Sequence, residues 1–398
     1  MRQNIEPMES FYRTHQYLLA NIHAPVRRQL MDEIDWSHRL IGIKGSRGVG
    51  KTTFLLQFAG EHFGNNPECL YINFNNLYFS HHTLLEFAVE FCRRGGKTLL
   101  IDQTFKYENW SAELRQCYDA CPDLQIIFSA SSVMRLIDEN NDIKDIVKVY
   151  NLRGFSFREY INLKTKLELP SYSLGEILEN QDTIADTILS KVNPMEYFGK
   201  YLEHGYYPFM LEKRIFSENL LKTMNMMMEV DILFIKQIEL KYLSKIRKLL
   251  YLIMQTAPAQ ANISQLATEI QTSRATIMNY IKYLKDARLL NTLYGEGDDY
   301  PKKPKVVYAH NTNLMHVVLH DGVNRDDERK TFLYNTLHSQ HKVNVGKHGS
   351  DFCLDGNIQI KYDNQSQYRH NTKTWFAVDT LSVDHKHEVP LWLLGFLY

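Results

Sequence analysis

A glycine-rich run near the start of the chain has the composition and spacing of a phosphate-binding loop. Gly45 and Gly50 flank the run, and Lys51 and Thr52 follow it directly. Glycines let successive N–H groups face phosphate oxygens, the lysine brings a cation to the β- and γ-phosphates, and the threonine hydroxyl binds Mg²⁺. The pattern, a Walker A motif, therefore predicts a site for ATP with Mg²⁺. The residues expected to bind are Gly45, Ser46, Arg47, Gly48, Val49, Gly50, Lys51, Thr52 and Thr53.

The sequence around this loop predicts the elements that position it. Residues 40–43 are apolar, as in a buried strand, and residues 52–62 have an apolar helical face, so a helix begins with its positive end at the phosphates. This context disfavours a chance glycine-rich turn. Further strands are expected at 69–74, 97–102 and 124–132, alternating with a helix at 83–94 and a helix capped by Ser111. The alternation predicts an α/β fold with a doubly wound parallel sheet, that of a P-loop NTPase.

Two later strands end in polar residues that suit a nucleotide site. Asp102 closes an apolar strand, where its carboxylate is expected to hold Mg²⁺ together with Thr52. Small hydroxyl residues end the next strand, and Ser129 or Ser131 could act as a polar sensor of the γ-phosphate. The alternative is that these serines cap a helix over residues 133–140.

Composition sets the broad class of protein. The 398 residues are 44% apolar, enough for several domains with large cores. Lys and Arg number 46, as do Asp and Glu, so the overall charge argues neither for nor against nucleic acid. The five cysteines are scattered without a CxxC pair, which disfavours a disulfide framework or zinc site. No secretory signal or membrane-spanning run stands out, so a cytoplasmic protein with no membrane contact is expected.

Together these motifs resemble those of prokaryotic AAA-type ATPases that carry a C-terminal domain of unknown function, within the archaeal-type and signalling P-loop ATPases. The resemblance runs over most of the chain. It implies an ATPase core at residues 1–153 and a helical lid at 154–244 that senses the nucleotide. The strings that carry it are Gly-Ser-Arg-Gly-Val-Gly-Lys-Thr-Thr (45–53), Leu-Leu-Ile-Asp (99–102), Tyr-Glu-Asn-Trp (107–110), Asp-Leu-Gln-Ile-Ile-Phe-Ser-Ala-Ser-Ser (123–132) and Leu-Arg-Gly-Phe-Ser-Phe-Arg-Glu-Tyr (152–160).

The same resemblance implies a role for Arg153, which lies near the arginine that follows the sensor strand in similar proteins. There it acts on the γ-phosphate of its own or a neighbouring nucleotide. The alternative for Arg153 and Arg158 is a structural ion pair with Glu159 or another acid.

One position departs from the family pattern. Similar ATPases follow the Walker B aspartate with a glutamate that deprotonates the attacking water, but here the residue is Gln103. An amide accepts a hydrogen bond from water but cannot take its proton. Binding of Mg·ATP is therefore expected with slow or absent hydrolysis, unless Glu108 or Asp119 lies close enough to replace the missing base.

Residues 245–312 have the pattern of a winged helix. Helices are expected at 246–255, 264–270 and 274–287, followed by strands at 289–293 and 305–308. Between residues 245 and 305, ten basic residues outnumber five acidic ones. This excess permits DNA phosphate contacts, while winged helices of such ATPases also serve as oligomer or regulatory modules. The residues expected at DNA are Arg274, Lys282, Lys302 and Lys303.

Residues 324–398 are expected to form a small α/β module with a helix at 329–340 and strands at 351–354, 358–361, 375–379 and 389–396. Asp351 with Gln359 and Lys361 resembles the metal site of PD-(D/E)XK nucleases, but Gln359 replaces the second carboxylate. A single carboxylate binds Mg²⁺ poorly, which favours a nuclease-like fold without cleavage. An ordinary ion pair between Asp351 and Lys361 is the alternative.

Two functional interpretations follow. The chain is either an ATP-dependent molecular switch that acts on DNA, a partner protein or other copies of itself, or an ATP-dependent DNA-processing or defence protein whose chemistry sits at Asp351 and Lys361.

Overall fold

A computed structural model describes residues 7–137, 140–212, 215–369, 373–383 and 385–398. The chain forms two compact units, Met1–Arg153 and Gly154–Tyr398. In the described residues, no helix is both long and apolar enough to cross a membrane.

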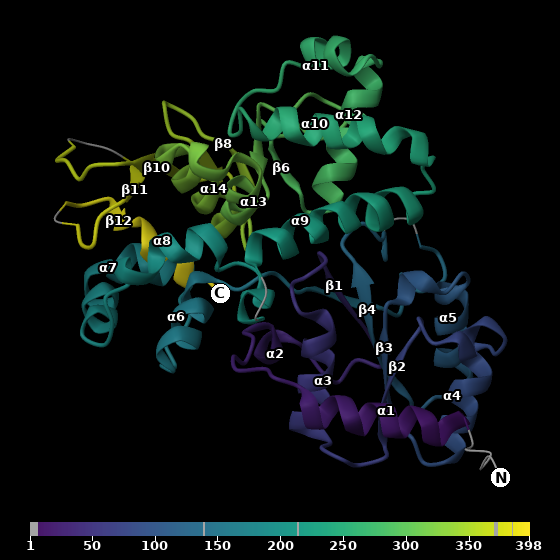
Figure 1. The fold of residues 1–398 in the computed structure, drawn as a ribbon. Helices are drawn as coiled ribbons and strands as arrows, with labels where there is room; N and C mark the ends of the chain where they lie inside the picture. The colour runs from purple at the N-terminus through teal and green to yellow at the C-terminus, as the bar shows by residue number, and fades with distance from the viewer. Residues whose placement is uncertain (1–6, 138–139, 213–214, 370–372, 384) are drawn as a thin grey trace. The chain divides into compact units, whose positions relative to one another are not determined.

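The first unit is built on a five-stranded parallel sheet with the strand order β2-β3-β4-β1-β5 (Figure 1). This order is typical of a P-loop NTPase and confirms the predicted α/β fold with its parallel sheet. Strands β1 to β4 are almost wholly buried and rich in Leu and Ile, as expected for a sheet covered on both faces, whereas the edge strand β5 is half-buried to exposed. They are β1 (Leu40–Gly45), β2 (Cys69–Asn73), β3 (Thr98–Asp102), β4 (Gln125–Ser131) and β5 (Lys148–Asn151).

Helices pack in pairs against this sheet: α4 lies beside α5, and α1 lies beside α3 (Figure 1). Thr83 caps α4 through a capping box with Glu86, as Thr and Glu three residues apart predict. The helices of the unit are α1 (Pro7–Asn21), α2 (Leu30–Glu33), α3 (Lys51–His62), α4 (Leu84–Arg93) and α5 (Trp110–Ala120).

Two local predictions in this unit are wrong. Ser111 does not cap α5, because the helix starts at Trp110 with Asn109 at the N-cap, two residues earlier than a cap at Ser111 predicts. The Ser111 hydroxyl donates to Asp142 at 2.6 Å instead. The helix expected at 133–140 is also absent from the described part of that range, where Val133 lies in a turn and residues 134–137 are irregular; residues 138 and 139 lie outside the described residues.

The second unit begins with helices and ends in a mixed sheet. Its helices are α6 (Phe157–Thr165), α7 (Leu174–Leu189), α8 (Met195–His204), α9 (Phe216–Met226), α10 (Leu243–Met254), α11 (Ile263–Ile270), α12 (Arg274–Asp286), α13 (Thr312–Leu319) and α14 (Arg325–Leu337). Its strands are β6 (Leu290–Leu293), β7 (Val306–Ala309), β8 (Val343–Val345), β9 (Phe352–Leu354), β10 (Ile358–Asp363), β11 (Thr374–Val378) and β12 (Glu388–Pro390).

The segment from α10 to β7 has the element order expected of a winged helix. Ser273 caps α12, whose residues Ile277, Ile281 and Leu284 are buried, and β6 pairs antiparallel with β7. The wing, formed by β6 and β7, also contacts the C-terminal sheet. The N–H of Val345 in β8 donates to the carbonyl oxygen of Tyr294, directly after β6, at 2.9 Å.

The C-terminal sheet has the order β12-β11-β10-β9-β8. The prediction of a strand at 389–396 is wrong. β12 ends at Pro390, and Leu391–Phe396 form a 3₁₀ turn. All six residues of the turn are buried. A strand alternates its side chains between two faces, whereas a tight turn directs them around its axis into a surrounding core.

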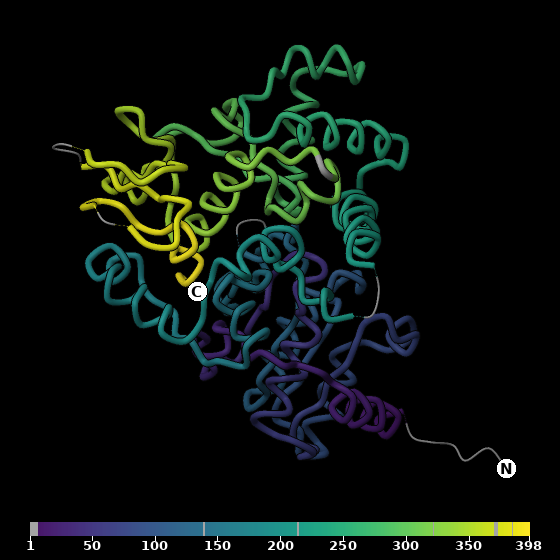
Figure 2. Tube along the Cα trace, turned by 60° about the vertical axis from the view of Figure 1, so that its left-hand side comes forward, coloured from purple at the N-terminus to yellow at the C-terminus, as the bar shows by residue number. Residues whose placement is uncertain are grey.

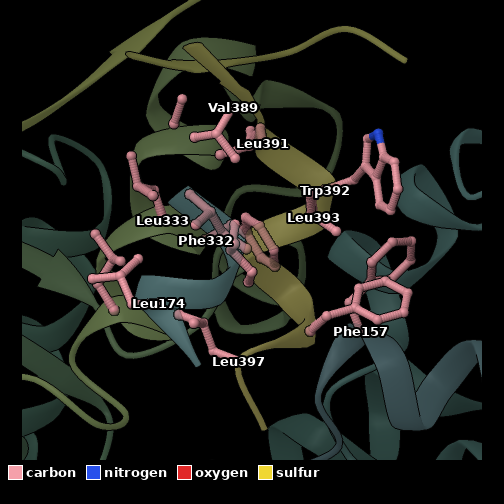
Figure 3. Packing of buried hydrophobic residues seen from close by; sticks show 14 of the residues in the cluster. Phe157, Leu174, Phe332, Leu333, Val389, Leu391, Trp392, Leu393 and Leu397 are labelled. Atoms are coloured by element: carbon pink, nitrogen blue, oxygen red, sulfur yellow. The ribbon is translucent and has the colours of Figure 1, made fainter. Parts of the chain in front are cut away.

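Helices α6, α7 and α8 share one hydrophobic core with this C-terminal segment. Phe157 and Leu174 pack in one cluster with Phe332, Trp392 and Leu397 (Figure 3). Figure 2 shows α7, in teal, beside the yellow C-terminal strands, in agreement with its contacts to β12. The division of this unit into a lid, a winged helix and a nuclease-like module stays a prediction.

Candidate functional site

The glycine-rich loop connects β1 directly to α3, at the carboxyl edge of the sheet. Gly48 and Gly50 have φ angles of +85° and +92°, which glycine adopts without strain. A Cβ on Gly45 would lie 2.5 Å from the carbonyl oxygen of Leu152, so only glycine fits where β1 ends. The loop therefore needs glycine at all three predicted positions, at Gly48 and Gly50 for the backbone angle and at Gly45 for lack of space.

Lys51 places its ammonium group on the loop itself. Its Nζ donates to the carbonyl oxygens of Gly45 at 2.9 Å and Ser46 at 2.8 Å. An ammonium group carries three donors and a full charge, so it makes this loop an attractive place for an anion. The positive end of α3 begins at the same residue.

Asp102 is the centre of a buried hydrogen-bond cluster at the end of β3. Its Oδ2 accepts from the hydroxyl of Thr52 at 2.6 Å and from the phenol of Tyr71 at 2.8 Å. Its Oδ1 accepts from the hydroxyl of Ser129 and from the N–H of Gln103 at 2.9 Å. The structure thus brings the predicted residues Thr52, Asp102 and Ser129 into direct contact.

The arrangement at Ser129 distinguishes between the two roles considered for the serines that end β4. Ser129 touches the carboxylate of Asp102, and no helix follows in residues 133–137 for the serines to cap. The N–H of Ser131 lies 3.4 Å from the Sδ of Met134, within a turn. Ser129 is therefore the better candidate for a polar sensor.

Gln103 occupies the left-handed backbone region, with φ 56° and ψ 45°. Its N–H donates to Asp102 Oδ1 and, at 3.0 Å, to Ser129 Oγ. A left-handed conformation is uncommon outside glycine, and it is maintained here by bonds to two neighbouring strands. The backbone of Gln103 is thus part of the Asp102 cluster, although its side chain lacks a titratable group.

Neither acid considered as a replacement base joins this cluster. Asp119 lies in the last turn of α5 and pairs with Arg115 at 3.0 Å on the surface. The carbonyl of its neighbour Tyr118 bonds Arg39, which precedes β1, so Asp119 lies at the amino edge of the sheet. Crossing the sheet along a strand of this length spans roughly 20 Å. Glu108 is exposed.

Arg28 is a buried residue at the loop that sequence reasoning missed. Its Nη1 donates to the carbonyl oxygen of Val49 at 3.1 Å and its Nη2 to that of Arg153 at 2.6 Å. Arg28 therefore connects the glycine-rich loop to the last residue of the first unit. Nothing in its local sequence indicates this role. The action of Arg153 on a γ-phosphate stays a prediction.

Arg158 and Glu159 both have structural contacts. Arg158 donates to the carbonyl oxygens of Leu169 and Tyr398, each at 3.1 Å. Glu159 completes a capping box with Ser156 at the start of α6.

The cations expected at DNA differ in their surroundings. Lys302 pairs with Asp298 at 2.6 Å, and the Lys282 ammonium lies 4.6 Å from the centre of the Tyr300 ring. Arg274, at the start of α12, and Lys303, in the turn of the wing, are exposed. These two residues are the better placed for a phosphate.

The residues that resemble a nuclease site are engaged with other groups. Asp351 Oδ2 accepts from the N–H of Tyr362 at 2.8 Å, and Gln359 Oε1 accepts from the hydroxyl of Ser350 at 2.7 Å. Two further carboxylates on this sheet, Asp363 and Glu388, both bind Arg369. In the described part of the chain, no group of three or more His, Cys, Asp or Glu residues could hold a metal.

Two family matches cover much of the chain. Residues 37–161 match an AAA domain, and residues 195–315 match a domain of unknown function, DUF8612. The chain thus contains an AAA-type P-loop ATPase domain followed by this second domain. The first match spans the glycine-rich loop, Asp102 and Ser129.

The chain is also 27% identical over 274 residues to the uncharacterized protein MJ1637 of Methanocaldococcus jannaschii. The alignment covers 65% of this chain and 57% of that archaeal relative, so the chain spans little more than half of the relative's length.

Similar solved structures include the Aeropyrum pernix Orc1 protein in complex with DNA, at 10% identity and a TM-score of 0.30, covering 80% of this chain and 93% of that one. AMPPCP-bound DnaA from Aquifex aeolicus has 16% identity and a TM-score of 0.24, and the match covers 71% of this chain and 89% of that one. Scores this low support no conclusion about function.

Proposed function

We propose that this protein binds Mg·ATP at its glycine-rich loop and works as a nucleotide-dependent molecular switch with slow hydrolysis. The observation that carries the proposal is the 2.6 Å contact between Thr52 and Asp102, inside a segment that matches an AAA domain. This contact joins the start of α3 to the end of β3. The two residues proposed to bind the metal, Thr52 after the glycine-rich loop and Asp102 at the end of β3, therefore lie next to each other.

The residues at the loop fit both Mg²⁺ and the triphosphate of ATP. A hydroxyl and a carboxylate are the hard oxygen donors that Mg²⁺ accepts, and Thr52 and Asp102 would hold it. Loop N–H groups, the α3 terminus and Lys51 match the negative charge of a triphosphate. When bound, Mg²⁺ would neutralise charge on the phosphate oxygens.

Slow hydrolysis follows because the described residues of the cluster include no carboxylate besides Asp102, which would hold the metal. The residue after Asp102 is an amide, and Asp119 and Glu108 lie outside the cluster. Ser129 and Thr52 carry neutral hydroxyls, which are too weakly basic to take a proton from water. A structure determined after soaking with Mg·ATP tests whether ATP is cleaved at all: an intact γ-phosphate supports a binder, whereas ADP shows that hydrolysis occurs, and its rate is then measured as phosphate release.

The switch itself is supported by Arg28. Because it bonds both Val49 in the loop and Arg153, a change in the loop on nucleotide binding would reach the residue that leads into the second unit. Light scattering and limited proteolysis with and without Mg·ATP test this step. Identical oligomeric state and cleavage pattern in both conditions would contradict a switch.

We further propose that duplex DNA is a partner through α12 and the wing. Replacing Arg274 and Lys303 with alanine should weaken duplex binding and lower the salt slope by about one for each phosphate that the variant no longer binds. Fluorescence anisotropy over a series of salt concentrations measures both effects. Lys144→Ala, on the surface of the first unit, is the control, and equal binding by all three proteins would contradict the proposal.

The alternative function, an active nuclease, predicts metal-dependent DNA cleavage that requires Asp351, whereas the switch predicts none. We expect no metal-dependent cleavage of plasmid or single-stranded DNA, and no change in that result for Asp351→Ala. Cleavage by the wild-type protein that Asp351→Ala abolishes would favour the nuclease instead.

A further inference from the structure

The phenol of Tyr71, on β2, contacts the same carboxylate oxygen of Asp102 that accepts from Thr52. Tyr71 lies on β2, in register with Leu100 of β3, and its hydroxyl ends 2.8 Å from Asp102 Oδ2. This is the oxygen that also accepts from Thr52. Tyr71 and Asp102 are 4% and 2% exposed, so little water competes for the contact.

The direction of these hydrogen bonds follows from the chemistry of the groups. An ionised carboxylate only accepts, so Tyr71 and Thr52 both donate to Asp102. A phenol is protonated at neutral pH, so Tyr71 supplies the proton of its hydrogen bond to Asp102. Since the single hydroxyl proton of Thr52 points at Asp102, its lone pairs stay available to a metal ion.

A further bond fixes the phenol in turn. The amide Nδ2 of Asn73 donates to the Tyr71 oxygen at 3.3 Å, and the amide Oδ1 accepts from the N–H of Asn75 at 2.8 Å. A chain of hydrogen bonds therefore runs from the end of β2 through Tyr71 to Asp102. Without the phenol, Thr52 would be the one hydrogen-bond partner left to Oδ2 among the residues that the structure describes.

We propose that Tyr71 is a positioning residue for Mg²⁺, holding Asp102 Oδ2 and, through it, the hydroxyl of Thr52 in the geometry that receives the metal. The inference rests on the proposed function, because it assigns a role within the Mg·ATP site. Partners of metal ligands commonly change metal affinity by about 10- to 100-fold when removed, because they orient the ligands.

The test is Tyr71→Phe, which keeps the buried ring and removes only the hydroxyl. The matched control is Tyr107→Phe, which removes a similar phenol-to-carboxylate bond, 2.7 Å from Glu113, in the same unit but outside the Asp102 cluster. ATP binding is measured by titration calorimetry in EDTA and across a Mg²⁺ series. Tyr71→Phe should lose about tenfold in Mg²⁺ affinity, with unchanged ATP affinity in EDTA.

Asn73→Ala provides a second test that leaves the phenol in place. It should shift the Mg²⁺ dependence in the same direction by a smaller factor, because the hydroxyl loses its own partner. If the wild-type protein binds ATP with a Mg²⁺ dependence that Tyr71→Phe shares, the positioning role is overturned while the proposed function stands. A wild-type protein that binds no ATP in either condition overturns the proposed function and this inference with it.

Discussion

Lys51→Ala should reduce ATP affinity by about 100-fold or more, because the triphosphate loses a cation and its charge-assisted hydrogen bonds. In the folded chain the Lys51 ammonium lies on the loop, bonded to the carbonyl oxygens of Gly45 and Ser46. Titration calorimetry with ATP in the presence of Mg²⁺ measures the loss.

The matched control is Lys97→Ala. Lys97 carries the same charge in the same unit, but it pairs with Glu68 at 2.6 Å on the surface, next to the amino end of β3. An exposed pair of this kind contributes little to stability and lies away from the loop. Lys97→Ala should therefore bind ATP as the wild type does. Unchanged binding by Lys51→Ala would refute the assignment of the loop.

Gln103→Glu should raise ATP turnover by about 100-fold, because a positioned general base typically contributes 10²- to 10⁴-fold. The backbone of Gln103 is already held by Asp102 and Ser129, so the substitution changes an amide into a carboxylate without a change in side-chain length. Phosphate release under saturating Mg·ATP measures the effect.

Two variants control for this result. Gln103→Ala removes the amide without adding a base and should stay at the slow wild-type rate. Gln103→Glu combined with Lys51→Ala should lose most of the gained turnover at the same ATP concentration, because Lys51→Ala weakens ATP binding by about 100-fold or more. Wild-type turnover within the ordinary range of about 1–100 per second would contradict slow hydrolysis. No gain from Gln103→Glu would show that a missing carboxylate is not the cause.

Much of the fold could be predicted because its signals are local. The strand before the loop, the capping box at Thr83 and the cap at Ser273 each lie within a few consecutive residues. The failures also have local causes. Residues 389–396 are uniformly apolar, and such a run does not distinguish a strand from a tightly wound turn that is buried on all sides.

The candidate site divides in the same way. Thr52, Asp102 and Ser129 were predicted because each ends an apolar strand or follows the glycine-rich loop. Tyr71 was missed, since its role depends on β2 lying next to β3. Arg28 was missed because its partners, Val49 and Arg153, are 21 and 125 residues away in sequence.

The sequence by itself determined the glycine-rich pattern that predicts a phosphate-binding loop, and the amide of Gln103 directly after Asp102, because both are properties of contiguous residues. The tertiary structure decided which side chains surround that aspartate. The sheet order places β2 and β4 on either side of β3, so Tyr71 and Ser129 reach the same carboxylate from opposite neighbours. Strand order depends on packing between segments far apart in the chain, and local patterns do not encode it.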